Sequence, residues 1–435
     1  MFRSFRIRNY RLFIVGQFIS LTGGWMQIVA QDWLVLQLSD NSGTALGVVT
    51  ALQFLPILVF TLYAGKLADR LDKRKLLIAV NAAWAVLAAA LGILVISGGA
   101  QLWHVFVFAA VFGAVNAVEV PVRQSFASEL VGADLLPNAL SLSAATFNTA
   151  RIVGPALAGL CIAWLGTGPV FVLNALTYAG PMVGLLMMKS ADLYRTLSAK
   201  KPGNVRDGLA YVRRRPDLML PMALMGVIAM LGYNFQLTLA IMSKTVFHNG
   251  AASFGLLTSV LALGALCGAL AGTGRDARPS VYVILGGALA FGILETILGF
   301  APTYLSMVVL LFPTGFAMVY FAQACNQRVQ MGVPAEYRGR VMSLYMLVFA
   351  GTTPIGAPII GWLSEHVSAR SSIWVGGLAS IVTALVALAV RIRVRGVQVS
   401  FAARPWPTLR FAEPDVDELS VSVLPGRALL GRFAR

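Results

Sequence analysis

Five polar or small residues recur at helical spacing near the start of the chain. Gln17, Ser20, Gly24, Gln27 and Gln31 are separated by three, four, three and four residues, so one face of a helix carries all five. The amide side chains of such a stripe can hydrogen-bond a polar substrate, whereas lipid would not tolerate that face. The alternative is that each amide bonds a neighbouring helix, and for any single glutamine both interpretations stand.

Charged side chains also occur within or beside apolar stretches. Arg151 shares a helical face with Ser141 and Asn148, and an unpaired arginine inside a span costs at least ~2.5 kcal/mol, so it needs a partner or water. Asp32 adjoins the glutamine stripe and Glu119 ends another apolar run. A buried carboxyl group can carry a proton. We therefore expect Asn148 and Arg151 to belong to a binding site, and Asp32 and Glu119 to be candidates for proton coupling.

The elements that position these residues are predicted to be membrane-spanning helices. Of 435 residues, 58% are hydrophobic and 12% are charged, about half the charged share of a typical soluble domain. The apolar runs reach the ~20 residues that cross a bilayer, and they lack the alternation of a barrel strand. We expect an all-α polytopic membrane protein with spans near residues 12–37, 44–64, 76–97, 102–122, 139–164, 169–188, 219–240, 252–273, 280–300, 303–325, 341–363 and 371–390.

The positive charges fall in alternate connections between these spans. Among 34 Lys and Arg residues, the connections of the other set hold only Lys244 and Arg370. By the positive-inside rule, both termini are cytoplasmic and the number of spans is even. The net charge of +16 is therefore explained by membrane orientation, and nucleic acid is not an expected partner.

The chain divides into two halves with matching features. Residues 189–218 form the longest polar interruption, and they separate a six-span bundle at 1–188 from another at 219–391. Residues 392–435 follow as a cytoplasmic tail that we expect to be loosely ordered, because it combines prolines with an acidic run. An internal repeat predicts parallel bundles related about the membrane normal. Its matches are Ser141, Leu142, Phe147, Gly154 and Gly159 with Ser343, Leu344, Phe349, Gly356 and Gly361, and Gly47 and Thr50 with Gly255 and Thr258.

The connection between the second and third spans carries a recognisable signature. Residues 65–77 read GKLADRLDKRKLL, which resembles the G-x-L-a-D-r-x-G-r-k-x-x-l signature of the major facilitator superfamily, with Asp72 where glycine is usual. The resemblance covers about residues 5–392. Further stretches are similar to its branch of enterobactin-type siderophore exporters and other secretion or drug-efflux members. These stretches are Glu119, Pro121, Arg123 and Gln124; Asn148, Arg151, Gly154 and Pro155; and Asn234, Phe235 and Gln236.

The resemblance implies a substrate cavity lined by spans one, four, seven and ten. Each of these spans carries a polar face, and convergence of the four faces would form one aqueous path. With Gln17, Gln27, Gln31, Asn148 and Arg151, the expected lining residues are Asn116, Tyr233, Asn234, Gln236, Tyr320 and Gln323.

The resemblance also implies a cytoplasmic latch around the signature loop. After Gly65, Asp69 would lie against the positive start of span eleven. Arg70 or Arg74 would pair with Glu119, for which Arg123, four residues further on, is a competing partner. The alternative is that this basic loop only fixes the orientation of the chain. Bending and close packing between the halves are expected at Gly154, Pro155, Gly159, Gly356, Pro358 and Gly361.

Several classes of chemistry are excluded or disfavoured. No G-x-x-x-x-G-K-[ST] loop occurs, so the chain does not itself hydrolyse nucleotide. Cys161, Cys267 and Cys325 lie in apolar runs without metal-ligand spacing, and no paired catalytic acids or nucleophile constellation is present. We expect no enzyme, no metal and no cofactor.

The sequence and the resemblance together predict a monomeric secondary transporter of the bacterial inner membrane. It would export a small amphiphilic compound, such as a siderophore or drug, by alternating access and in exchange for protons. The alternative is a membrane subunit of a larger transport assembly that a partner powers or regulates, with the C-terminal tail as its docking element.

Overall fold

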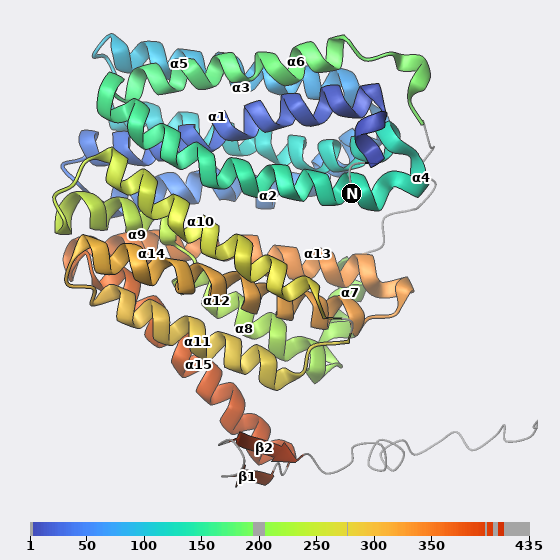
Figure 1. Ribbon diagram of the computed structural model, residues 1–435, viewed down its shortest axis with the longest axis vertical. Coiled ribbons are helices and arrows are strands. Elements are labelled where there is room, and N and C mark those ends of the chain that lie inside the picture. Colours follow the sequence, from blue (N-terminus) through green and yellow to red (C-terminus); the bar gives the residue numbers. More distant parts are fainter. Residues whose placement is uncertain (1–2, 195–204, 276, 396–397, 403–407, 413–435) are drawn as a thin grey trace, which may run out of the picture.

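The computed structural model describes residues 3–194, 205–275, 277–395, 398–402 and 408–412. For residues 61–70, 133, 205–207, 335, 394–395 and the two strands, it describes the backbone alone. The helices form two bundles that lie side by side, the first in the upper part of Figure 1 and the second below it.

The first bundle contains six spans in six helices. The apolar runs fold as helices because lipid offers no partner for an unsatisfied backbone N–H or C=O group. Helix α4 holds two spans, since Gly132 adopts φ 71° and ψ 175° and breaks the helical path between them. The helices are α1 (Arg8–Leu38), α2 (Gly43–Arg70), α3 (Lys73–Ile96), α4 (Leu102–Leu165), α5 (Thr167–Thr177) and α6 (Ala179–Leu186), with short 3₁₀ turns η1 (Arg3–Arg6) and η2 (Ser190–Asp192).

The second bundle begins after the connection between the halves. Its first span is interrupted at Tyr233 and Asn234, and its fifth span at Thr352. The elements are α7 (Val205–Arg213), α8 (Pro216–Gly232), α9 (Phe235–Ile241), the π-helix η3 (Met242–Val246), α10 (Ala251–Thr273), α11 (Val281–Gly299), α12 (Tyr304–Met331), α13 (Ala335–Gly351), α14 (Thr353–His366) and α15 (Ser371–Arg395), then strands β1 (Gln398–Ala402) and β2 (Thr408–Ala412).

The described residues contain twelve helical segments that are long and apolar enough to cross a membrane. Their outer surfaces expose large apolar side chains, among them Trp164 (81% exposed) and Leu305 (69% exposed), which only lipid can cover without cost. The predicted all-α membrane fold is therefore confirmed.

Two segments outside the spans contain regular structure among their described residues, while residues 195–204, 396–397, 403–407 and 413–435 lie outside the description. Within the connection at 189–218, α7 packs against α13, where the rings of Tyr211 and Tyr337 stack with centroids 4.7 Å apart. In the tail, β1 pairs with β2 in an antiparallel hairpin beyond the end of α15 (Figure 1). Short polar and charged stretches of this kind lack the long apolar pattern on which the predictions of spans rested.

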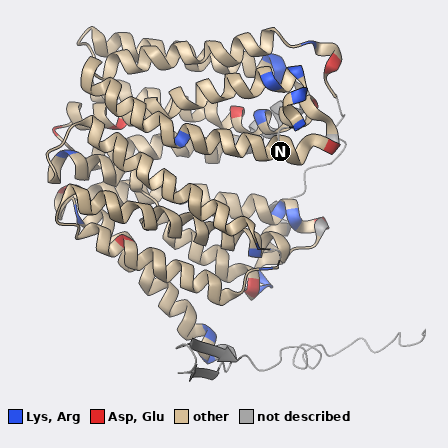
Figure 2. Cartoon of the chain, in the orientation of Figure 1, with Lys and Arg blue, Asp and Glu red and all other residues tan. Residues whose placement is uncertain are grey.

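The two ends of the bundles differ in charge. The N-terminus, the start of α3 and α7 lie at one end, which we call the basic end, and Figure 2 shows most of the Lys and Arg residues there. The connection between α1 and α2 and the connection between α9 and α10 lie at the opposite end.

Glycines allow the halves to meet closely towards the opposite end. A side chain at Gly47 of α2 would lie 2.5 Å from the Ala357 carbonyl oxygen of α14, and one at Gly255 of α10 would overlap the Pro155 carbonyl oxygen of α4. Gly47 and Gly255 are repeat partners in the sequence. The repeat is therefore visible in three dimensions as two similar helix contacts.

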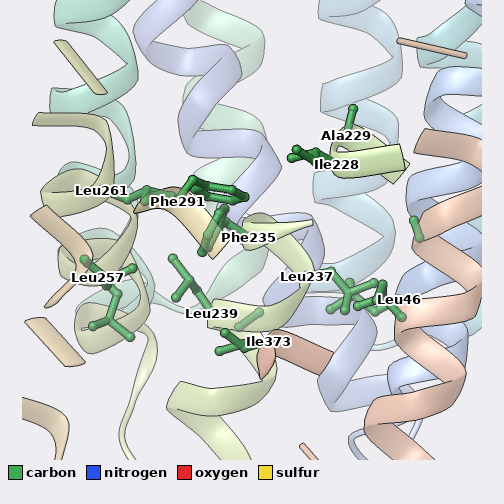
Figure 3. Close-up of a cluster of buried hydrophobic side chains, with 14 of the residues drawn as sticks. Leu46, Ile228, Ala229, Phe235, Leu237, Leu239, Leu257, Leu261, Phe291 and Ile373 are labelled. Atoms are coloured by element: carbon green, nitrogen blue, oxygen red, sulfur yellow. The ribbon is translucent and has the colours of Figure 1, made fainter. Parts of the chain in front are cut away.

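Further contacts seal the same end. Glu365 Oε2 accepts hydrogen bonds from Ser42 Oγ at 2.6 Å and from the Thr44 amide at 2.9 Å. A continuous group of buried apolar side chains also crosses between the halves, and Figure 3 shows Leu46 of α2 beside Leu237 of α9.

Candidate transport pathway

A cavity of about 250 Å³ lies between the two halves. The first half contributes Trp25, Phe54 and Arg151, and the second contributes residues around the interruption between α8 and α9, together with Thr258 and Phe349. The wall is mostly apolar and aromatic, and Arg151 is the one charged residue among its described lining residues. We call this space the interface cavity.

A second cavity of about 330 Å³ lies mainly within the first half. Its lining includes Gln17, Gln27, Asn116 and the aromatic side chains of Trp84, Phe112 and Tyr178. It shares Trp25, Phe54 and Gln236 with the interface cavity. We call it the bundle cavity, and the shared residues make the two cavities adjoin.

Most of the glutamine stripe on α1 faces the bundle cavity. Gln17, Ser20, Gly24 and Gln27 line it, and a side chain added at Gly24 would meet nothing within 4 Å. Gln27 Oε1 accepts a hydrogen bond from Asn174 Nδ2. Both interpretations of the stripe therefore apply to Gln27, since it lines the cavity and also bonds a neighbouring helix.

Gln31 differs from the other members of the stripe. It is fully buried, and neither amide atom has a partner among the described residues. It is not among the residues lining either cavity, so it belongs to the packed opposite end of α1.

Arg151 is positioned by α4 near the middle of a span. Its Nε is buried without a hydrogen-bond partner among the described residues. The next residue, Ile152, has its carbonyl oxygen bonded by Ser259 Oγ of α10 at 2.7 Å, so the backbone beside Arg151 is fixed across the interface. The structure thus presents a guanidinium group to the interface cavity.

The expected residues of span seven all line the interface cavity. Tyr233 donates its hydroxyl hydrogen to the Met318 carbonyl oxygen at 2.7 Å, and Asn234 Nδ2 donates to the Met230 carbonyl oxygen at 2.8 Å. Both contacts stabilise the interruption between α8 and α9. Gln236 lines both cavities, and its Nε2 is buried without a partner among the described residues.

Three other expected lining residues lie elsewhere. Asn148 donates to the Ala144 carbonyl oxygen of its own helix at 2.9 Å and lines neither cavity. Tyr320 lies under the Arg275 guanidinium group, 3.9 Å from the ring centroid, and Gln323 packs against Gly272. In this structure the polar face of span ten therefore meets the end of α10 and Arg275 just beyond it, and not the two cavities.

The acids in the spans occupy different surroundings. Glu119 lines the bundle cavity and forms a 2.7 Å ion pair with Arg123. Asp32 is 4% exposed and lines neither cavity, and Glu295, at 2% exposed, lies between Gly232 and Gly376. Glu119 is thus the acid that the structure places at the pathway.

The latch can be followed only in part. Gly65, Asp69 and Arg70 fall in the stretch of α2 whose side chains lie outside the description. Arg74 donates to the carbonyl oxygens of Leu185 and Leu186 and to Ser190 Oγ. In this structure Arg74 therefore ties α3 to the end of α6, and Glu119 is paired with Arg123, the competing partner.

The expected hinge residues fall into two kinds of contact. Pro155, Gly159, Pro358 and Gly361 lie where α4 meets α10 and where α14 meets α2, between the halves. Gly154 packs against Thr22 and Trp25 of α1, and Gly356 packs against Met230 of α8. Small residues therefore serve both the interface and the packing inside each half.

Several lining residues were not predicted from the sequence. They include Trp25, Gln53, Phe54, Trp84, Thr258 and Thr353. Gln53 was detectable as an amide within an apolar run, whereas apolar and aromatic lining residues do not differ in sequence from those that face lipid.

Twelve spans in two bundles, with cavities between and within them, define a membrane transporter of the major facilitator fold. The family model described as "Transmembrane secretion effector" matches residues 1–423. The chain belongs to this family, which confirms the predicted branch and makes the protein a transporter and not an enzyme.

Curated relatives and solved structures agree with this assignment. The chain is 23% identical to the Staphyloferrin A transporter of Staphylococcus aureus (86% of this chain, 94% of the relative) and 26% identical to the multidrug efflux pump Tap of Mycolicibacterium fortuitum (85% and 93%). It is 22% identical to macrolide efflux protein A of Streptococcus pyogenes (88% and 96%).

The fold is similar to those of transporters of known structure. A mutant of the nucleoside transporter NupG superposes with a TM-score of 0.70 at 12% identity, covering 88% of this chain and 99% of that one. A bacterial homolog of the lysosomal transporter Spinster gives a TM-score of 0.68 at 13% identity, covering 88% and 95%. These likenesses concern the fold alone.

Proposed function

We propose that this protein exports a small amphiphilic compound from a bacterial cell by alternating access, in exchange for protons. The observation that carries the proposal is a cavity between two halves that are sealed together towards one end by a repeated pair of glycine contacts. The efflux functions named for the relatives support export, and the compounds named there support a substrate of siderophore or drug size.

The orientation follows from the charge distribution. The positive-inside rule places the basic end in the cytoplasm, so the sealed opposite end would face outwards. In this assignment the structure is a state closed to the outside. Opening of the glycine contacts, with closure near the latch, would expose the cavities to the other side.

Proton coupling is assigned here to Glu119. This carboxylate lines the bundle cavity beside the amides of Gln17 and Asn116, and its ion pair with Arg123 would be lost on protonation. Substrate and proton could therefore compete for neighbouring positions in one space. Asp32 remains a second candidate for this role, because it is a buried acid of α1.

The proposal is tested with inside-out membrane vesicles that contain the protein. An imposed pH gradient, acid inside, should drive accumulation of a radiolabelled macrolide or of staphyloferrin A, and a protonophore should abolish it. Accumulation that a protonophore leaves unchanged would contradict proton coupling but not transport. No accumulation of any tested compound would count against the export function.

The same assay addresses the alternative of a larger transport assembly. Truncation after Arg395 removes the tail hairpin and all that follows. Under our proposal the truncated protein keeps its transport activity. Lost transport with normal membrane expression would favour a partner that docks on the tail.

A further inference from the structure

Among the buried side-chain polar atoms that lack a partner, those of residues lining the two cavities are all hydrogen-bond donors. Among the described lining residues they are Arg151 Nε, Gln236 Nε2 and Trp84 Nε1. An indole N–H and a guanidinium N–H can only donate. The buried oxygens that lack partners belong to residues lining neither cavity, namely Gln31, Thr44, Glu295, Gln323 and Gln327.

The charged residues of the cavities also favour a ligand that accepts hydrogen bonds. The acid of the bundle cavity, Glu119, is neutralised by Arg123 at 2.7 Å. The interface cavity has no acid among its described lining residues, so the positive charge of Arg151 is left uncompensated. A buried charge without a partner is unfavourable. A ligand that supplies a negatively charged oxygen would remove this cost, whereas a cationic ligand would add to it.

The rest of the interface cavity suits an apolar body. Trp25, Phe54, Phe235, Phe349 and Leu261 form much of its wall. Aromatic rings of this kind accept a flat apolar group by stacking or edge contacts. The donors therefore occur in a mostly apolar surface, which is typical of a site that fixes one polar group of an otherwise apolar ligand.

We propose that the two cavities select an anionic amphiphile, whose carboxylate is bound by Arg151 and Gln236 and whose apolar part lies against the aromatic wall. This inference rests on the proposed transport function and specifies its substrate class. Arginine suits the role because its planar guanidinium group can bind a carboxylate through two parallel hydrogen bonds. The indole N–H of Trp84 is available to a second oxygen on a longer ligand.

The test uses three probes with the same ring system and different charges. Binding of 1-naphthoate, 1-naphthamide and 1-naphthylmethylammonium to the purified full-length protein in lipid nanodiscs is measured by calorimetry. The expected order of affinity is naphthoate first, naphthamide second and the ammonium compound last. Tighter binding of the ammonium compound than of naphthoate, or no measurable binding of naphthoate, would overturn the proposal.

Substitutions at Arg151 test whether this residue causes the charge selectivity of probe binding. R151Q should weaken naphthoate binding about tenfold or more and change naphthamide binding by less than about threefold, because the amide carries no charge. R151K should give an intermediate affinity, since it keeps the charge but not the paired donors. Naphthoate binding unchanged in both variants would also overturn the proposal.

Arg275→Gln is the matched control. Arg275 also has buried guanidinium nitrogens without partners among the described residues, but it lies over Tyr320 and lines neither cavity. R275Q should bind all three probes as the wild type does. Retained naphthamide binding by R151Q shows that this variant is folded, and R151K provides a second test if it is not.

The outcome is separable from that of the transport assay. Charge-selective binding without transport in vesicles would contradict the proposed function alone. Transport of a cationic drug together with preferential binding of the ammonium probe would contradict the substrate class alone.

Discussion

At the scale of single residues, the ion pair between Glu119 and Arg123 is the polar contact that substitution can test most directly. Its two side chains are 6% and 21% exposed, so removal of one partner leaves a charge largely cut off from water. Glu119→Gln should lower the free energy of unfolding by about 1–3 kcal/mol. The double variant E119Q/R123Q should recover part of this loss, because it leaves no unpaired charge. Both values can be measured by denaturant unfolding in detergent.

The variant E119Q also tests whether Glu119 couples transport to the pH gradient. If Glu119 couples transport to the pH gradient, E119Q should bind substrate but no longer accumulate it in inside-out vesicles. Accumulation at the wild-type level would exclude Glu119 and leave Asp32 as the candidate to examine.

Residue patterns in the sequence predict part of the candidate site. The stripe on α1 was predictable because residues three and four apart must share a helical face. Tyr320 and Gln323 show the limit of that argument. Periodicity states that they share a face, but the neighbour that this face meets depends on helix rotation, and here the neighbour is α10.

At the scale of elements, the contacts of α2 with α14 and of α10 with α4 should control the sealed end. Gly47→Val and Gly255→Val would place methyl groups where backbone carbonyl oxygens now lie, and overpacking of this kind costs about 1–3 kcal/mol. Each variant should therefore favour the state in which this end is open. Gly286→Val is the matched control, because a side chain there meets nothing within 4 Å.

The measurement is labelling of one cysteine placed at Thr258, which lines the interface cavity. In a background without Cys161, Cys267 and Cys325, an impermeant maleimide should react about tenfold faster in the glycine variants and at the unchanged rate in the control. Equal rates in all variants would show that these contacts do not hold the end shut.

The glycines themselves were visible in the sequence repeat, but their two roles were not. Gly154 and Gly356 pack inside their own halves, whereas Gly159 and Gly361 meet the other half. Gly154 and Gly159 lie five positions apart on α4, and Gly356 and Gly361 lie five positions apart on α14. Two glycines five positions apart point in different directions around the helix axis. Which of them faces the other half depends on how the helix is rotated in the fold, and the sequence alone does not give that rotation.

At the scale of the whole molecule, orientation is the prediction on which the direction of transport depends. Single cysteines replace Ser97, at the opposite end, and Asp192, at the basic end, in the same cysteine-free background; both positions are exposed. In intact cells an impermeant maleimide should label S97C and spare D192C. Permeabilised cells should label both, and the reverse pattern in intact cells would invert the proposed direction.

The number of spans was predictable because a bilayer imposes a minimum apolar length on each of them. The helix α7 and the tail hairpin were not, since they lie outside that constraint and depend on particular contacts such as Tyr211 with Tyr337. The apolar lining of the cavities could not be predicted either, because residues such as Trp25 and Trp84 are of the same type as residues that face lipid.

The interruption at Tyr233 and Asn234 gives the seventh span a joint. On one side α8 is a continuous helix, and on the other the seven residues of α9 reach into the sealed end. Tyr233 is tied to α12 through Met318, so the joint has a fixed pivot. In the proposed alternating-access cycle, tilting of the short helix α9 about this joint would open the sealed end and displace less lipid than the rocking of an entire half.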